Sequence, residues 1–509
     1  MTKEELKIAK IHEKAARKEA KIHAKAIKKQ DKLERKQARP GYAQKEALHQ
    51  EKLEIKNQKK AVKKKKKKEI RMETDEAIRA SYPNSTQPYA KWDKLDNTAH
   101  LFPVIAGEDM TNVYRMCIVL KEEIEPLYLE KALHKLLPWF QNFHSVLRQG
   151  FFWYYFEENP KRYPPIREES EYPCQYFAPN SNRDYLFRLT YYKCRINLEV
   201  FHVLTDGSGA LNFLRELTYQ YLNFAHPDLV FRHGQGLSSE TSLNTEDSYE
   251  KNYRHYNLKG YANETAYLIK GPLMKGSKMG ILRGMMDIHQ FKKVSKKYGC
   301  TINELVVATF FYSVYHEYMH TLPSRHPITA GVPVDLRPYF NSETTKNFFV
   351  MISAKFKPVE NREYTFEEIV AATKESLRSQ LNKDHLEEIF SFAVGNEKIM
   401  ILRTIPLVFK NMGIRAAYKA AARKNSTTIT NVGSLKVKED YRQYIDDYYC
   451  FLSRSYGQDI KACISSFEDR LSVCFSSKLT DVAIQRGFFR KLAQEGLEIK
   501  IESNGVYYG

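Results

Sequence analysis

From about residue 76 onward, hydrophobic residues occur either in strand-like runs or at helical spacing. The first block of predicted elements extends to about residue 225. Runs of β-branched and aromatic residues predict strands at 115–120, 145–156, 185–192 and 195–204. Apolar residues at helical spacing predict helices at 127–140 and from 211 to 222. The last of these strands therefore leads directly into a helix. At such junctions α/β proteins place chemically active side chains.

A second block of the same kind follows a polar stretch at 225–270, which we expect to be a long crossover. Strands are predicted at 279–286, 328–335, 348–356, 427–432, 461–467 and 471–476. Helices are predicted at 288–297, 301–318, 366–381 and 481–494, and Thr301-Ile302-Asn303-Glu304 is a capping box for the second. The pattern predicts a mixed α/β (α+β two-layer) protein with an extension at 1–75 and two lobes at 76–265 and 266–509.

The N-terminal extension carries most of the net charge of +20. Residues 1–72 hold 26 Lys+Arg and 10 Asp+Glu, so only +4 belongs to the rest of the chain. Their composition favours helix, includes six consecutive lysines at 63–68, and cannot bury a core. Three interpretations stay open: a solvated helical or disordered tail, docking on an anionic membrane surface, and contact with nucleic acid or ribosome. Because no aromatic residue lies among the lysines to stack on bases, nucleic acid is the weaker interpretation.

The cysteines and the hydropathy of the chain indicate the cellular compartment of the protein. The seven cysteines are scattered and form no CxxC pair, which is typical of reduced, mostly buried thiols in a cytosolic protein. No stretch approaches the roughly 18 to 20 apolar residues that a membrane span needs, and no apolar segment of a signal peptide follows the basic N-terminus. We therefore expect a cytoplasmic protein, peripheral at the inner face of a membrane if the extension binds there.

The segment HVLTDG, residues 202–207, ends the strand at 195–204 and precedes the helix. Imidazole has a pKa near 6.5, so His202 is suited to accept a proton from an attacking hydroxyl and return it later. Asp206 need not touch the imidazole, because a carboxylate at this turn can lock the loop through a buried arginine. Gly207 would permit a tight turn into the helix.

These residues resemble the CoA-dependent acyltransferase superfamily of chloramphenicol acetyltransferase, plant BAHD acyltransferases, alcohol acetyltransferases and peptide-synthetase condensation domains. Its motif is HHxxxDG, and residues 201–207 match it except that Phe201 replaces the first histidine, a position that varies in the superfamily. VPVDLRP at 332–338 is similar to the segment whose arginine pairs with the motif aspartate. A weaker likeness lies at Thr430-Asn431-Val432-Gly433. The resemblance covers roughly residues 80–509.

The resemblance implies two chloramphenicol-acetyltransferase-like lobes that form a tunnel. It implies an acyltransferase, an O-acyltransferase similar to alcohol acetyltransferases, that moves an acyl group from a CoA or carrier-protein thioester to a small-molecule alcohol or amine. His202 would be the general base, and Asp206, Gly207 and Arg337 would support the site. No cofactor or metal is implied beyond the thioester co-substrate. The oxyanion donor is open, with Ser353, Ser453 and Ser455 as candidates.

A competing motif is HExxH at 316–320, with His326 six residues further on. Histidines at i and i+4 of one helix can bind zinc and leave Glu317 as the base of a hydrolase. However, Pro323 stands where the metzincin pattern needs glycine, and the preceding helix is apolar almost all round, as in a buried packing helix. Two non-enzymatic hypotheses also stay open: a binding or scaffold protein of the same fold, and a His202 that is merely a hydrogen-bonded strand end with Asp206 as a helix cap.

Overall fold

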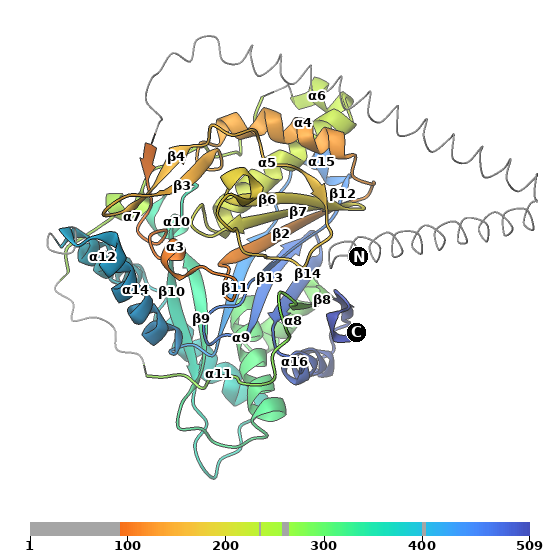
Figure 1. Cartoon of the computed structure of the whole chain (residues 1–509). Helices are drawn as coiled ribbons and strands as arrows, with labels where there is room; N and C mark the ends of the chain where they lie inside the picture. The colour runs from red at the N-terminus through yellow and green to blue at the C-terminus, as the bar shows by residue number, and fades with distance from the viewer. Residues whose placement is uncertain (1–91, 234–235, 257–263, 400–403, 509) are drawn as a thin grey trace, which may run out of the picture. The chain divides into compact units, whose positions relative to one another are not determined.

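The computed structural model describes residues 92–508 apart from 234–235, 257–263 and 400–403 (Figure 1). The chain divides into two compact units, Met1–Asn84 and Ser85–Gly509, and the account below concerns the second. The predicted extension at 1–75, with its expected contacts to membrane or nucleic acid, lies outside the described residues. None of the described helices is long and apolar enough to cross a bilayer.

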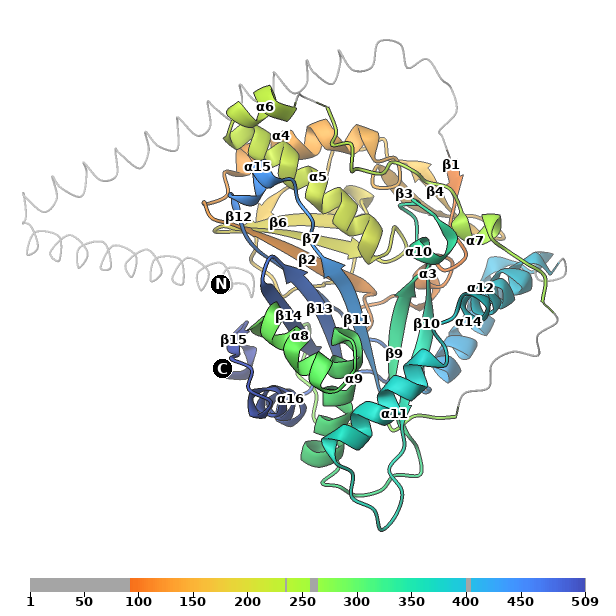
Figure 2. The same ribbon diagram turned by 180° about the vertical axis from the view of Figure 1, so that it is seen from behind.

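One half of the second unit is a five-stranded sheet with two helices packed on one face (Figure 2). The strand order is β12 (Ile445–Leu452), β2 (Val113–Leu120), β7 (Arg195–Phe201), β6 (Phe187–Tyr192) and β5 (Arg167–Glu168). The helices α4 (Pro126–Leu136) and α5 (Gly207–Ala225) cover it, and their apolar side chains fill a continuous core with the strands. β7 is central, and its carboxyl end leads into α5 through the HVLTDG segment.

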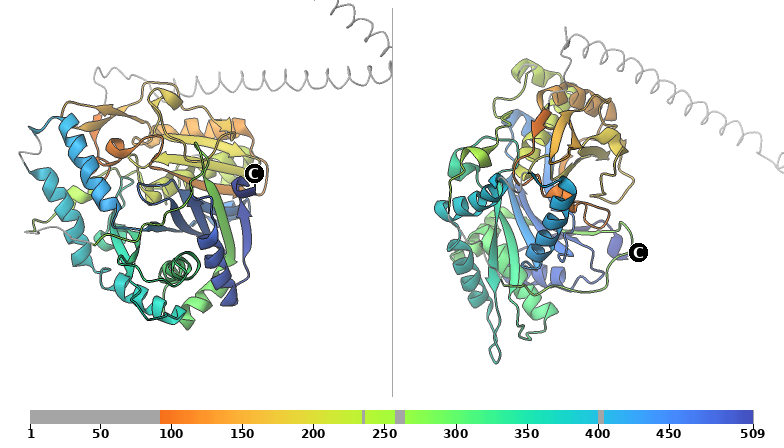
Figure 3. Two further views of the ribbon diagram at one scale, coloured as in Figure 1. Left: turned by 60° about the horizontal axis from the view of Figure 1, so that its bottom comes forward. Right: turned by 60° about the vertical axis from the view of Figure 1, so that its left-hand side comes forward.

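The other half is a seven-stranded sheet in the order β10 (Phe349–Phe356), β9 (Ile328–Asp335), β11 (Thr427–Ser434), β13 (Ile460–Phe467), β14 (Arg470–Ser477), β8 (Gly280–Asp287) and β15 (Lys500–Ser503). β11 runs parallel to β9 and β13, and the remaining pairs are antiparallel. Four helices lie on one side of it: α8 (Ile288–Lys297), α9 (Ile302–Ser313), α11 (Phe366–Arg378) and α16 (Ala483–Gln494) (Figures 2 and 3). Capping boxes from Thr301 and Thr365 open α9 and α11. The mixed α/β fold class is confirmed.

Several elements differ from the sequence prediction. The expected strand at 145–156 is a hairpin of β3 (Ser145–Gln149) and β4 (Tyr154–Glu158), which pairs with β1 (Trp92–Lys94) in a small third sheet. The aromatic run at its tip has the composition of a strand, but the chain reverses there. Helices α12 (Lys383–Lys398) and α14 (Leu407–Ala422) and strand β12 were not predicted. The remaining short helices are α3 (Phe102–Ile105), α6 (Asp228–His233), α7 (Ser248–Lys251), α10 (Arg337–Phe340), α15 (Glu439–Arg442), η1 (Leu137–Trp139), η2 (Ser181–Asp184), η3 (Val314–Tyr318) and η4 (Val506–Tyr508).

One strand of the second predicted lobe belongs to the sheet of the first. β12 comes from the second predicted lobe, yet it pairs along its length with β2 of the first. Cys450 of β12 also forms a disulfide with Cys463 of β13, in the other sheet. The expectation of seven reduced thiols is therefore wrong at this pair, since sequence spacing gave no sign that the two strands lie face to face. The lobe boundary at 265/266 stays a proposal, as does the tunnel between the lobes.

Candidate active site

His202 directly follows β7 and lies among three aromatic rings. Its ring is stacked on Phe102 with a centroid separation of 4.5 Å, and the Tyr114 ring packs edge-on with a centroid separation of 5.1 Å. Phe349 completes the set at 5.5 Å. Desolvation by this apolar surround lowers the pKa of His202 below its usual value of 6.5. The ring therefore remains neutral at neutral pH, the state in which imidazole accepts a proton.

A buried amide fixes which ring nitrogen of His202 carries the proton. The Nδ1 atom lies 3.1 Å from Asn347 Oδ1. Asn347 Nδ2 donates to Asp96 Oδ2 at 2.9 Å, and the Asn347 backbone N–H donates to the same oxygen at 3.2 Å. Since the amide NH₂ group is committed to Asp96, the amide oxygen faces the imidazole, and Nδ1 must be the donor. The lone pair then lies on Nε2.

Asp96 itself is almost completely inaccessible to solvent. Burial raises its pKa to about 7, against the lowering effect of the bonds from Asn347 and Ala99. Its second oxygen, Oδ1, accepts from the Ala99 backbone N–H at 2.8 Å. Asp96 thus anchors the amide that holds the histidine, and an Asp-Asn-His chain runs from the core to the imidazole.

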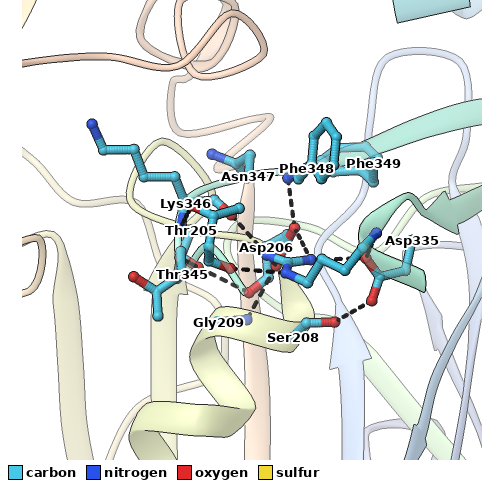
Figure 4. A network of polar contacts seen from close by, with 12 residues as sticks. Thr205, Asp206, Ser208, Gly209, Asp335, Thr345, Lys346, Asn347, Phe348 and Phe349 are labelled. Carbon is cyan, nitrogen blue, oxygen red and sulfur yellow. Dashed lines mark hydrogen bonds and ion pairs between the residues drawn. The ribbon is translucent and has the colours of Figure 1, made fainter. Parts of the chain in front are cut away.

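The Asp206 carboxylate joins three segments of the chain (Figure 4). Arg337 donates to both of its oxygens, Nη1 to Oδ2 at 2.9 Å and Nη2 to Oδ1 at 3.0 Å. Asp206 also caps α5 by accepting from Gly209 N at 3.1 Å, and it accepts from Phe348 N at 2.9 Å. Because Phe348 adjoins Asn347, the ion pair holds in place the loop that carries the amide.

Arg337 is buried by the same loop. Its Nε donates to the Thr344 carbonyl at 2.8 Å, and Nη2 donates to the Lys346 carbonyl at 2.7 Å. Burial alone would lower the pKa of Arg337, but Asp206 and Asp335 outweigh it and keep the guanidinium charged. The structure thus brings together His202, Asp206 and Arg337, and it places the carboxylate beneath the loop rather than against the imidazole.

The glycine of the motif behaves differently from the expectation. Gly207 does not belong to the described residues with a positive φ, so no left-handed turn demands it. A Cβ there would lie 3.4 Å from Val432, which also places the 430–433 segment beside the motif. At Gly209, in contrast, a Cβ would lie 2.0 Å from Thr205 Oγ1 and 2.4 Å from the Thr345 carbonyl. The position that excludes a side chain is therefore Gly209, where α5 meets the loop.

Of the three candidate oxyanion serines, Ser353 and Ser455 have clear partners. Ser353 Oγ donates to Asn425 Oδ1 at 3.1 Å, and Ser455 Oγ accepts from Lys461. Ser453 contributes its backbone N–H to the Val113 carbonyl. Lys461 is buried, and desolvation lowers its pKa to about 7. When charged, Lys461 also contributes to the lowering of the pKa of His202.

Sequence reasoning missed Asp96, Asn347 and Lys461. A lysine inside the apolar strand IKACISSF is a signal that could have been used, because a buried lysine is rare without a function or a partner. Asp96 and Asn347 gave no such signal, since asparagine and aspartate are common in loops.

The HExxH motif does not form a metal-binding helix face. α9 ends at Ser313 and continues as the π-helical turn η3, and His320 has a φ of 54°. His316 and His320 are therefore not at i and i+4 of one regular helix, the arrangement in which an HExxH motif binds zinc. Glu317 forms an ion pair with Arg490 at 3.5 Å. In the described ranges no group of three His, Cys, Asp or Glu side chains could hold a metal ion.

A cavity of about 720 Å³ lies beside the Asp96 anchor. Leu95 and Asn97, the sequence neighbours of Asp96, contribute to its wall. The β3–β4 hairpin supplies most of the aromatic lining, from Phe151 to Tyr155. Tyr249, which also lines it, donates to the backbone carbonyl of Phe349 at 2.6 Å. A residue that lines the cavity, Tyr249, is thus hydrogen-bonded to Phe349, one of the three aromatic residues around His202.

Comparison with known proteins identifies the fold. No protein-family model and no curated relative matches the chain. Among solved structures, TRI101 of Fusarium sporotrichioides complexed with coenzyme A and T-2 matches 81% of this chain and 99% of its own, with a TM-score of 0.56 and 11% identity. The trichothecene 15-O-acetyltransferase TRI3 of the same fungus covers 81% and 96%, with a TM-score of 0.54 and 11% identity. Polyketide synthase associated protein 5 of Mycobacterium tuberculosis covers 78% and 96%, with a TM-score of 0.51 and 15% identity.

Proposed function

Since the chain has the fold of the CoA-dependent acyltransferase superfamily, we propose an enzyme that transfers an acyl group from a thioester to an acceptor hydroxyl or amine. The observation that carries this proposal is the tethered imidazole of His202. Its Nδ1 lies 3.1 Å from Asn347 Oδ1, so Nε2 is the nitrogen left to accept a proton. A fold alone does not define chemistry, but an oriented neutral base at a strand end supports it.

In the proposed reaction Nε2 of His202 removes the proton from the acceptor as its oxygen or nitrogen attacks the thioester carbonyl carbon. A bond forms between acceptor and carbonyl carbon, and the carbonyl oxygen becomes an oxyanion. When this intermediate collapses, the carbon–sulfur bond breaks and the thiolate takes the proton back from Nε2. The products are the ester or amide and the free thiol, and the enzyme returns to its starting state.

In the proposed reaction Asp206 and Arg337 are positioning residues that do not contact the substrates. They fix the loop that presents Asn347, and Asn347 fixes the tautomer of His202. Among the three serines, Ser455 is the one that we propose for the oxyanion role, because its hydroxyl accepts from the buried Lys461. The thioester is the co-substrate, from CoA or from an acyl carrier protein. Since one structural neighbour is named an O-acetyltransferase, a hydroxyl is the acceptor that we propose first.

The test is thiol release from acetyl-CoA and longer acyl-CoAs in the presence of pooled alcohols and amines. We expect acceptor-dependent release by the native protein and its loss in His202→Ala. His144→Ala is a matched control, because burial also lowers the pKa of His144 and it belongs to the same half of the unit. Release that is equal in native protein and His202→Ala would overturn the role of His202. Silence in both with CoA and carrier-protein donors would favour the non-catalytic binding protein.

A further inference from the structure

Helix α14 exposes most of its surface. Among its 16 residues, Leu407 and Ala422 are buried. Its inner side is held by Arg415, whose Nε donates to the Val104 carbonyl at 2.8 Å, and by Tyr418 near Met110. On the outer side Val408, Phe409 and Met412 are 64%, 65% and 65% exposed. A helix with large apolar side chains on its solvent side calls for a partner.

The tip of the β3–β4 hairpin extends this apolar surface. Leu407 N donates to the Phe151 carbonyl at 2.9 Å, and Asn411 Nδ2 donates to Tyr154 OH at 3.1 Å. Phe151 and Phe152 at the tip are 71% and 40% exposed. We call the surface formed by Phe151, Phe152, Val408, Phe409 and Met412 the α14 surface.

The charged residues of α14 itself are all basic, whereas Glu157 and Glu397 line the cavity to which Phe151 and Phe152 contribute. Lys410 lies with its Nζ 3.4 Å from the Trp153 ring, so it sits where hairpin and helix meet. Arg415 and Lys419 follow along the helix. Exposed aromatic side chains bordered by cations are the composition of helices that lie in the interface of an anionic bilayer.

The basic residues of α14 also argue against a second copy of the chain as the partner that covers the α14 surface. Two α14 surfaces brought face to face would place like charges opposite one another, which costs free energy. An anionic lipid surface offers the opposite charge and an apolar layer within reach of Phe and Met side chains.

We propose that the α14 surface docks this protein on an anionic membrane surface. α14 packs on α3, and Phe102 of α3 is stacked on His202. Phe151 and Phe152 also line the cavity beside Asp96. Docking thus brings the bilayer to the wall of this cavity, and the acceptor class becomes a lipid-soluble alcohol or amine. This last consequence rests on the proposed function, whereas docking does not.

The experiment is hydrogen exchange of the full chain with and without vesicles of phosphatidylcholine and about one-third phosphatidylserine. We expect slower exchange at 150–154 and 407–413 on vesicles. The double variant Phe409→Ser, Met412→Ser should lose this protection and bind vesicles about ten-fold more weakly, because two apolar side chains no longer leave water. Leu322→Ser is the matched control, since Leu322 is 64% exposed outside this surface. Thermal melts check that the variants fold.

Three outcomes would overturn the proposal. In the first, the chain binds vesicles without protection at 150–154 and 407–413, as it would if residues 1–72 were the whole anchor. In the second, protection appears without lipid as protein concentration rises, which would assign the surface to a second copy. In the third, Leu322→Ser weakens binding as much as the double variant. None of these depends on turnover, so failure of docking and failure of acyl transfer are separable.

Discussion

Two histidine motifs in this chain, around His202 and His316, differ in what surrounds each ring. Desolvation lowers the pKa of both side chains. The Nδ1 atom of His202 is tied to the fixed amide of Asn347, which leaves Nε2 to accept a proton. His316 lies between Tyr312 and Tyr315, and its Nε2 is buried without a hydrogen-bond partner in the described part of the chain. Burial of a histidine is therefore not enough to make it a general base. Neighbouring groups must also hold the proton on one ring nitrogen and leave the lone pair of the other accessible.

The largest expected contrast is in turnover. Replacing His202 by Ala removes the proposed base, and we expect acyl transfer to fall by about 10²- to 10⁴-fold. The double variant His316→Ala, His320→Ala should keep turnover within about two-fold, since surface or packing histidines contribute little to chemistry. Both are measured by thiol release with saturating donor. A loss of turnover in the second variant that added zinc restores would make the HExxH motif a catalytic candidate again.

The second contrast is between the ion pairs next to the two motifs. Asp206–Arg337 is buried and bidentate, whereas Glu317–Arg490 is 3.5 Å long and its arginine is half exposed. Arg337→Ala leaves a buried carboxylate unpaired, and we expect it to lower the free energy of unfolding by about 3–5 kcal/mol. Arg490→Ala should lower it by less than about 1 kcal/mol. Urea unfolding of each variant measures this difference.

A lysine at position 337 sharpens the same comparison. Arg337 makes five hydrogen bonds to Asp206, Asp335, Thr344 and Lys346 that a single ammonium group cannot reproduce. Arg337→Lys should therefore recover only part of the lost stability. Full recovery would mean that charge alone, and not the geometry of the guanidinium, holds the loop.

The third contrast tests the amide that only His202 has. In Asn347→Ala the Nδ1–H loses its acceptor, and we expect kcat to fall about 10- to 100-fold with little change in KM. Because the Asn347 bond raises the pKa of His202, its loss should also move the acidic limb of the activity profile to lower pH. Asn425→Ala is the control, as Asn425 accepts from Ser353 and not from the imidazole. A lower kcat with an unmoved limb would leave Asn347 a purely structural residue.

The sequence predicted correctly those features that depend on residues close together in the chain. The strand at 328–335 and the helix at 288–297 have the predicted bounds, because their apolar periods agree with their caps and turns. Arg337 opposite Asp206 was expected from a resemblance, and it lies there. The Asp96–Asn347 link joins residues 251 positions apart, and β12 joins the sheet of the other lobe. No local pattern encodes such pairings. α14 was missed for a related reason, since it buries little and so shows little periodic signal.

The smallest expected effect concerns pH. Activity needs neutral His202, so turnover should decline on acidification only below pH 6.5, as pH falls through the lowered pKa. For folding, a histidine with a lowered pKa binds fewer protons in the folded state, so its contribution to stability is present above 6.5 and is lost as pH falls toward the folded value. We expect His316→Gln to weaken this acidic loss of stability by about 1 kcal/mol or less while the acidic limb of the activity profile stays in place.

Asp96 has the opposite effect on stability: because its pKa is raised in the folded state, the free energy of unfolding falls as pH rises from about 4 to about 7. Melting curves in Asp96→Asn and His316→Gln separate the two slopes, and an activity limb that moved in His316→Gln would show that the two histidines are not independent.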